Sequence, residues 1–344
     1  MTASKKLIKL LPTRRQWLVG AAALAGAATW PLRAWCAAPA TAFDTIDLDW
    51  TDRARQRDVP VRLYLPQPDG TTASMPPLPV PLVVFSHGIG GSRRGYRYLG
   101  EHFAGNGVAS LHLQHVGSDG QLWTGGSVFS MINRLQSAAQ DSEAIARVQD
   151  LRFALDTVFA GDIAPRLDAR RIVAAGHSYG ANTALLAAGA RVQRQGRMVE
   201  LRDPRVMAAI VLSAPPFYGD ADPQRILAGV QVPSLHVTAT ADVIRIPGYY
   251  SGADDRLAIF DATGSAAKWL AVFEGGSHSM FTDRAGTGGM ALNPQVKAAT
   301  KELSLAFLKK VFDGEGAALE SWPRRHAAIV ARFSASHQSA LIPP

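Results

Sequence analysis

Ser178 stands in a local sequence that is typical of a serine nucleophile. Residues 172–180 read Ile-Val-Ala-Ala-Gly-His-Ser-Tyr-Gly, an apolar run that ends in the pattern Gly176-x-Ser178-x-Gly180. A serine hydroxyl becomes a useful nucleophile when a sharp strand-to-helix turn exposes it and a base removes its proton. Such a turn presses strand and helix together, so the residues two places either side of the serine must be very small. The pattern predicts a nucleophilic serine between a buried strand and a small-residue helix.

A serine nucleophile needs a histidine base and a carboxylate that orients the histidine. His278 follows the apolar run Trp269–Phe273 through Glu-Gly-Gly-Ser, and Asp242 follows Leu235–Val237 through Thr-Ala-Thr-Ala. Both side chains are therefore expected at the carboxyl ends of strands, where open α/β sheets gather their sites. The chain order Ser178, Asp242, His278 predicts a triad in which His278 is the base and Asp242 is the acid that orients it.

The other histidines near these runs favour structural roles. His177 adjoins the nucleophile but points elsewhere in the turn, and His236 lies inside an apolar strand. His112 and His115 are three residues apart on a strand and should face opposite sides, which argues against a shared metal. Four further aspartates rival Asp242 but lie in turn-rich surroundings that suit solvated loops: Asp220, Asp222, Asp254 and Asp255.

The oxyanion that forms during acyl transfer requires backbone N–H donors. One is expected from Tyr179, the residue after the nucleophile. The other is expected from the loop 86–92, which reads Ser-His-Gly-Ile-Gly-Gly-Ser directly after an apolar strand. We favour the Ile89 amide, with Gly88 as the alternative. A glycine-rich loop could instead cradle phosphate, but no G-x-x-x-x-G-K pattern occurs there. The chemistry therefore needs neither a metal nor an organic cofactor.

Alternating strands and helices must position these residues. An antiparallel hairpin is expected over 43–50 and 59–65, where apolar and polar residues alternate. Beyond it, strands are predicted at 80–85, 108–113, 172–177, 208–212, 234–238 and 268–273, and helices at 95–105, 142–159, directly after Ser178 and near 294–312. This alternation indicates an α/β fold with a mostly parallel sheet and helices on both faces. One domain is expected over 41–315, followed by a partly ordered tail at 316–344.

The formal charge of +8 is concentrated in the first 40 residues, which carry six Lys or Arg and no Asp or Glu. The rest of the chain has a formal charge of +2, so no basic stripe remains for a nucleic acid. Paired Arg14 and Arg15 before an Ala/Gly-rich apolar stretch resemble a twin-arginine export signal, with Ala38-Pro39-Ala40 as a cleavage site. We therefore expect a periplasmic or secreted protein.

An uncleaved membrane anchor is the alternative for this segment, although Gly20, Gly26 and Pro31 interrupt the apolar run. The only cysteine, Cys36, leaves with the signal, and a lipoprotein site is disfavoured because bulky Trp35 precedes it. The mature protein is then expected to have no disulfide and no membrane span.

Several of these motifs resemble those of one group of bacterial enzymes. They are Ser86-His87-Gly88-x-Gly90-Gly91-Ser92, His115-Val116-Gly117-Ser118-Asp119, Arg147-Val148-Gln149-Asp150, Gly176-His177-Ser178-Tyr179-Gly180-Ala181 and Gly275-Gly276-Ser277-His278. They resemble the α/β-hydrolases often labelled predicted dienelactone hydrolases, a group similar to platelet-activating-factor acetylhydrolases and, more distantly, to cutinase-like polyesterases. The resemblance spans Phe43 to Phe312 and implies the α/β-hydrolase fold. True dienelactone hydrolases use a cysteine nucleophile, whereas this chain has Ser178, so a serine esterase is the better interpretation.

The expected reaction is a two-step acyl transfer on a small-molecule or lipid-like carboxylic ester, with short acyl chains as the default. An amidase or peptidase would use the same residues, and a catalytically silent binding protein is the third alternative. Two apolar segments could border the substrate: Gly117–Leu135, which could equally be a helix packed on the core, and Ile244–Tyr250. The sequence does not identify the acyl group, the alcohol or the oligomeric state.

Overall fold

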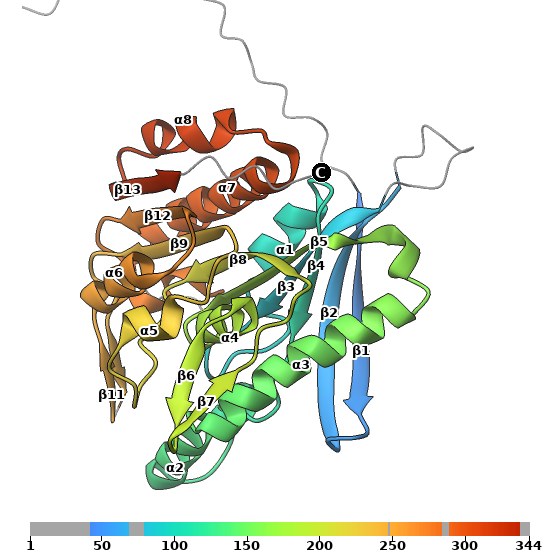
Figure 1. Ribbon diagram of the computed structural model, residues 1–344, viewed down its shortest axis with the longest axis vertical. Coiled ribbons are helices and arrows are strands. Elements are labelled where there is room, and N and C mark those ends of the chain that lie inside the picture. Colours follow the sequence, from blue (N-terminus) through green and yellow to red (C-terminus); the bar gives the residue numbers. More distant parts are fainter. Residues whose placement is uncertain (1–41, 69–78, 247, 284–288, 338–344) are drawn as a thin grey trace, which may run out of the picture. The chain divides into compact units, whose positions relative to one another are not determined.

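A nine-stranded sheet forms the centre of the computed structural model, which describes residues 42–68, 79–246, 248–283 and 289–337 (Figure 1). The strand order is β1-β2-β4-β3-β5-β8-β9-β12-β13. Six neighbouring strands run parallel: β4 (Ala109–Leu113), β3 (Val80–Ser86), β5 (Leu167–His177), β8 (Val206–Leu212), β9 (Ser234–Ala239) and β12 (Ala267–Phe273). The mostly parallel sheet that the sequence predicts is confirmed.

Antiparallel strands flank the parallel centre on one side. β1 (Phe43–Asp52) and β2 (Arg57–Pro66) form the predicted hairpin, and β2 also pairs antiparallel with β4. Val59, Val61 and Leu63 are fully buried at alternate positions of β2, because successive side chains of a strand point to opposite faces.

Helices cover both faces of the sheet, and each face has its own apolar core. One face carries α3 (Asp141–Ala160), α4 (Tyr179–Ala188), α5 (Pro223–Leu227) and α6 (Ala253–Ala262). The other carries α1 (Arg97–Ala104), α7 (Leu292–Asp313) and α8 (Ala317–Arg325). Parallel strands buried on both sides explain the nearly continuous apolar runs of β3, β8 and β9. No helix within the described residues has the length and apolar character needed to span a membrane.

The C-terminal segment differs from the expected partly ordered tail. After α8, β13 (Val330–His337) pairs antiparallel with β12 and extends the sheet, beside α7 in Figure 1. Trp322 of α8 is fully buried in the core, and its indole N–H donates to the Ala299 carbonyl at 2.9 Å. The sequence Trp-Pro-Arg-Arg suggests a helix breaker, but Pro323 lies inside α8, where tertiary packing of the neighbouring tryptophan prevails.

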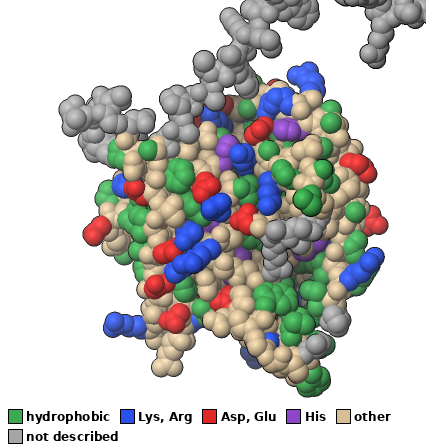
Figure 2. All heavy atoms as spheres, turned by 180° about the vertical axis from the view of Figure 1, so that it is seen from behind, with side chains coloured by type: hydrophobic (Ala, Val, Ile, Leu, Met, Phe, Trp, Pro, Cys, Tyr) green, Lys and Arg blue, Asp and Glu red, His purple; other side chains and the backbone are tan. Residues whose placement is uncertain are grey.

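Several shorter elements were not predicted. They are η1 (Gly120–Trp123), the hairpin of β6 (Arg191–Arg194) and β7 (Arg197–Glu200), the hairpin of β10 (Ile244–Ile246) and β11 (Tyr249–Ser251), α5, α6, α8 and β13. A helix was one of the two alternatives for Gly117–Leu135, and α2 (Val128–Ala138) forms there. The expected export signal, its cleavage site and Cys36 lie outside the described residues. On the face shown in Figure 2, basic and acidic side chains are interspersed rather than gathered by sign.

Candidate active site

Ser178 occupies a strained turn between β5 and α4. Its φ of 55° and ψ of −125° lie in a region that side chains rarely adopt, which is typical of a nucleophile elbow. Its own N–H donates to the Leu212 carbonyl at 2.9 Å. A Cβ on Gly176 would collide with the Gly180 backbone, and one on Gly180 would collide with the Ser86 carbonyl. Only glycine fits at these two positions, for the reason that the sequence pattern suggested.

The structure brings His278 and Asp242 to Ser178 from two neighbouring parallel strands. Asp242 follows β9, and His278 begins the short helix η3 (His278–Phe281) after β12. His278 Nε2 lies 2.8 Å from Ser178 Oγ, and His278 Nδ1 lies 2.8 Å from Asp242 Oδ1. The carboxylate fixes the proton on Nδ1, so Nε2 is left to accept the serine proton. This geometry is that of a serine, its base and the group that orients the base.

The carboxylate of Asp242 is fully buried and surrounded by donors. Thr238 Oγ1 donates to Oδ2 at 2.7 Å, the Ser213 hydroxyl donates to the same oxygen, and Arg256 Nη2 lies 3.4 Å from Oδ1. Burial opposes ionisation, but the hydrogen bond from His278 and the nearby positive charges outweigh it and hold the pKa of Asp242 well below its ordinary value. Asp242 is therefore a carboxylate over the whole physiological pH range.

Ser213 is a neighbour of this group that the sequence reasoning missed. It follows β8, has a φ of 56°, and its Oγ also lies 3.0 Å from His278 Nδ1. A small polar residue at the carboxyl end of the strand between β5 and β9 is the signal that could have found it.

His177 supports the site from behind, as the structural interpretation of this residue expected. Its Nε2–H donates to the His278 carbonyl at 2.9 Å, and its Nδ1 accepts from the Tyr96 hydroxyl at 2.8 Å. Burial lowers the pKa of His177 to about 3, so the ring is neutral and can keep both contacts.

Two backbone N–H groups beside Ser178 have no acceptor within the described residues: those of Ile89 and Tyr179. The alternative donor, the Gly88 N–H, is directed to Tyr96 Oη at 3.4 Å, which favours Ile89. The Gly88 carbonyl belongs to the same peptide unit as the Ile89 N–H. It accepts from His87 Nδ1 at 2.7 Å and from the Gly91 N–H at 3.0 Å. These two bonds fix the direction in which the Ile89 N–H points.

Ser178 lies between two cavities, both of which Ile89 also lines. The smaller, about 120 Å³, has mostly apolar walls that include Leu135, Leu186 and Phe217. The larger, about 560 Å³, is lined by residues 88–92 of the loop 86–92, Trp123 and His278 among others. Each of the two segments expected to border the substrate contributes residues to the smaller cavity, Leu135 from α2 and Ile244 from β10. α2 also packs into a small core of its own, so both alternatives for that segment hold in part.

The rival residues are engaged elsewhere. Asp222 caps α5, Asp255 accepts from the Gly252 N–H at the start of α6, and Asp220 pairs with Arg225. Asp254 lies in the first turn of α6. His236 is buried beside Ser234, and His112 contacts Ser110 and the Gly95 carbonyl, away from His115. No cluster of metal-ligating side chains occurs among the residues that the structure describes.

Comparison with known proteins supports the architecture. A ferulic acid esterase from Streptomyces cinnamoneus superposes with a TM-score of 0.59 at 23% identity, over 86% of this chain and 98% of the other. The chain has the α/β-hydrolase fold. A puromycin hydrolase superposes with a TM-score of 0.53 at 16% identity. The superposition covers 79% of this chain and 40% of the puromycin hydrolase chain. No protein-family model and no curated protein sequence matches the chain.

Proposed function

We propose that the protein is a serine hydrolase that cleaves carboxylic esters. The observation that carries the proposal is the continuous hydrogen-bonded line from Asp242 through His278 to Ser178, beside two backbone N–H groups with no acceptor in the described part of the chain. A buried carboxylate, a neutral imidazole and a serine in this order are the parts that acyl transfer requires.

In the proposed reaction, Ser178 Oγ attacks the ester carbonyl while His278 Nε2 takes the serine proton. The Ile89 and Tyr179 N–H groups bind the resulting oxyanion, and Asp242 stabilises the imidazolium. The tetrahedral intermediate collapses, the ester bond breaks, and His278 gives its proton to the departing alcohol. Water then attacks the acyl-enzyme with His278 again as base, which releases the acid and restores Ser178.

The direction of proton transfer assigns the two cavities. The departing oxygen must come within reach of His278 Nε2, and His278 lines only the larger cavity, so the alcohol occupies that one. The acyl group then occupies the smaller cavity. Its volume of about 120 Å³ is close to that of an apolar cavity of about 150 Å³ that holds benzene. Short acyl chains or a single unsubstituted ring fit there.

An amidase or peptidase remains the second candidate, because the similar puromycin hydrolase shares the fold and the same side chains would serve. A matched ester and amide of one acid separate the two: an ester hydrolase should cleave the ester without measurable turnover of the amide, whereas an amidase or peptidase should turn over both.

We also propose membership of the group that resembles platelet-activating-factor acetylhydrolases, and export through the twin-arginine route. Replacing both Arg14 and Arg15 by Lys should leave the protein in the cytoplasm, as measured by cell fractionation.

An acyl series of chromogenic esters with one alcohol tests the proposed activity. Wild type should hydrolyse the short members, with kcat/KM falling once the acyl group outgrows the smaller cavity, and Ser178→Ala should be inactive. Leu135→Ala should extend the series to longer chains. Arg245→Ala, which changes only the larger cavity, should leave the acyl preference unchanged. Equal activity of wild type and Ser178→Ala would refute the function.

A further inference from the structure

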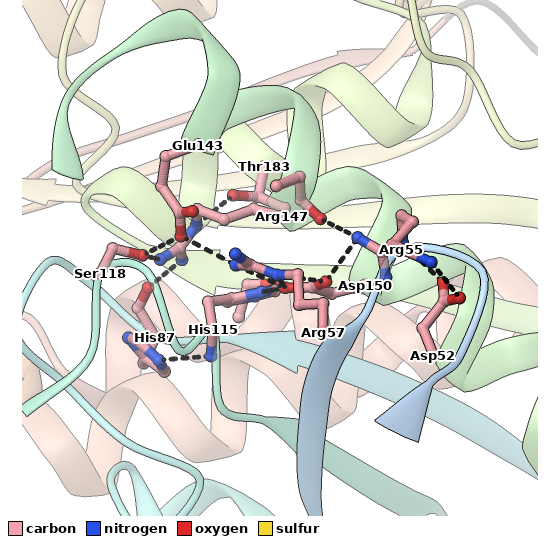
Figure 3. A network of polar contacts seen from close by, with 12 residues as sticks. Asp52, Arg55, Arg57, His87, His115, Ser118, Glu143, Arg147, Asp150 and Thr183 are labelled. Carbon is pink, nitrogen blue, oxygen red and sulfur yellow. Dashed lines mark hydrogen bonds and ion pairs between the residues drawn. The ribbon is translucent and has the colours of Figure 1, made fainter. Parts of the chain in front are cut away.

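A cluster of charged and polar side chains lies beside His87 of the loop 86–92, which is the loop expected to supply one oxyanion donor (Figure 3). Helix α3 contributes Glu143, Arg147 and Asp150, which are three or four residues apart and so project from one side of the helix. The side chains of Arg147 and Asp150 are fully buried. These charged residues occupy core-facing positions where an amphipathic helix normally carries apolar side chains.

Arg147 uses each of its three nitrogens. Nε donates to Thr183 Oγ1 at 3.0 Å, Nη1 donates to Ser118 Oγ at 2.7 Å, and Nη2 donates to the His87 carbonyl. The guanidinium also lies over the ring of Tyr179, 4.6 Å from its centre. A cation that stacks on an aromatic ring while its planar edge donates several bonds is a geometry that lysine cannot reproduce.

These contacts reach both elements that carry the oxyanion donors. On the loop side, the His87 carbonyl is two residues from the Ile89 N–H. The Ser118 carbonyl, from the same residue that Nη1 contacts, accepts from the Gly90 N–H at 2.8 Å. On the side of the serine turn, Thr183 Oγ1 accepts from Arg147 Nε and donates to the Tyr179 carbonyl at 3.1 Å. Arg147 thus links the loop to the first turn of α4.

The surrounding charges are arranged to keep this cation in place. Ser118 Oγ donates to Glu143 Oε1 at 2.7 Å, so the nearest carboxylate meets Arg147 only through a hydroxyl. Asp150 is engaged by Arg55, Arg57 and His115 instead. Burial lowers the pKa of Arg147, but a guanidinium stays protonated in proteins. Burying a cation without a direct carboxylate partner costs free energy, so Arg147 is better explained by the segments that its hydrogen bonds join than by a gain in stability.

We propose that Arg147 is a positioning residue that holds the Ile89 and Tyr179 N–H groups in the geometry needed for the oxyanion. The inference deepens the proposed serine hydrolase function and depends on it. Arg147 touches no substrate; its guanidinium sets the spacing of the two donors and adds a positive field behind the His87 peptide. Its loss should weaken transition-state binding and leave substrate binding unchanged.

The test compares Arg147→Met and Arg147→Lys with wild type on one short-chain ester. We expect kcat to fall by about tenfold to a hundredfold in Arg147→Met and to recover only in part in Arg147→Lys, with KM changed less than about threefold. A trifluoromethyl ketone, which forms a tetrahedral oxyanion with the serine, should bind more weakly by the same factor as the fall in kcat/KM. The matching non-fluorinated ketone, a ground-state mimic, should bind as in wild type.

Arg57→Met is the matched control, because it removes a guanidinium of the same cluster that contacts Asp150 and Glu143 but neither His87 nor Thr183. It should lower the unfolding temperature and leave kcat per folded molecule unchanged. Should Arg147→Met not fold, Arg147→Lys carries the same measurements. Equal falls in kcat for the Arg57 and Arg147 variants, or unchanged affinity for the trifluoromethyl ketone, would overturn the inference. Inactive wild type, by contrast, would overturn the proposed function itself.

Discussion

Two sets of serine, histidine and aspartate in this protein share the same hydrogen-bond connectivity. In one, Asp242 and Ser178 lie 2.8 Å from opposite nitrogens of His278. In the other, Asp150 Oδ2 lies 2.9 Å from His115 Nδ1, and His115 Nε2 lies 3.1 Å from Ser86 Oγ. Both serines also stand at or just after the carboxyl end of a parallel strand. Connectivity alone therefore does not distinguish a nucleophile.

Access and backbone geometry separate the two sets. Ser178 has a left-handed φ and lines both cavities, whereas Ser86 ends strand β3 and is 0% exposed. His278 is 17% exposed, but His115 and Asp150 are fully enclosed, and Asp150 also pairs with Arg55 and Arg57. The Ile89 and Tyr179 N–H groups beside Ser178 have no acceptor in the part of the chain that the structure describes. In the buried set, the backbone N–H of His115 instead donates to Nε2 of the His87 ring at 3.1 Å. The Ser178 set therefore opens onto two cavities, whereas the Ser86 set is enclosed in the protein interior.

The serines should give the largest contrast. Ser178→Ala is expected to lower kcat on a short-chain ester by a factor on the order of 10⁶. Ser86→Ala should keep kcat per folded molecule near that of wild type. It should lower the free energy of unfolding by about 1–3 kcal/mol, because it leaves a buried ring nitrogen without its partner. Steady-state kinetics and urea unfolding measure the two effects. A fluorophosphonate should label Ser178 alone, and a labelled Ser86 would break the comparison.

The aspartates should divide in the same way. Asp242→Asn is expected to reduce kcat about 10⁴-fold, because an amide no longer fixes the imidazole proton on Nδ1. Asp150→Asn should cost about 3–5 kcal/mol of unfolding free energy, because two arginines lose their buried partner. Its loss of kcat should be far smaller than that of Asp242→Asn. If Asp150→Asn lost activity at full stability, the buried set would have a more direct catalytic role than the geometry assigns.

The pH dependence of stability gives the smallest effect. Burial holds the pKa of His115 well below its ordinary value, that of His112 at about 4 and that of His236 at about 3. As the pH falls below about 6.5, these histidines become protonated in the unfolded chain but stay neutral in the folded protein. The unfolded state then binds more protons, so the free energy of unfolding decreases. Each ring contributes a slope of about 1.4 kcal/mol per pH unit. His236→Gln should reduce the slope of the unfolding free energy against pH, between pH 7 and pH 5, by about the amount that corresponds to one proton, which is about 1.4 kcal/mol per pH unit. An unchanged slope would contradict the burial argument.

Much of the site could be predicted because its signals are local. Gly176 and Gly180 bracket Ser178 for a steric reason that any sharp strand-to-helix turn imposes. His278 and Asp242 directly follow apolar runs, so their place at one sheet edge needs only the parallel topology. Arg147 and Ser213 were not predicted as neighbours of the site, because no local pattern around either residue indicates which distant group it contacts.

The end of the chain shows the complementary limit. A proline inside a short helix and an edge strand without strong alternation give weak local signals, so the sequence predicts a tail where the structure has α8 and β13. Their order comes from contacts that no local pattern records: Trp322 in the core of one face, and the hydrogen bonds that β12 offers to β13.

The sequence by itself determined the α/β alternation, the strained serine turn and the residues able to do acyl-transfer chemistry, because propensity, periodicity and small-residue sterics act over a few neighbouring positions. Only the tertiary structure decided which of two Ser–His–Asp sets lines a cavity, which amide N–H groups lack an acceptor among the described residues, and that Arg147 contacts both the His87 carbonyl and Thr183 of α4. Those outcomes depend on burial and on contacts between distant segments, and both exist only once the chain has packed.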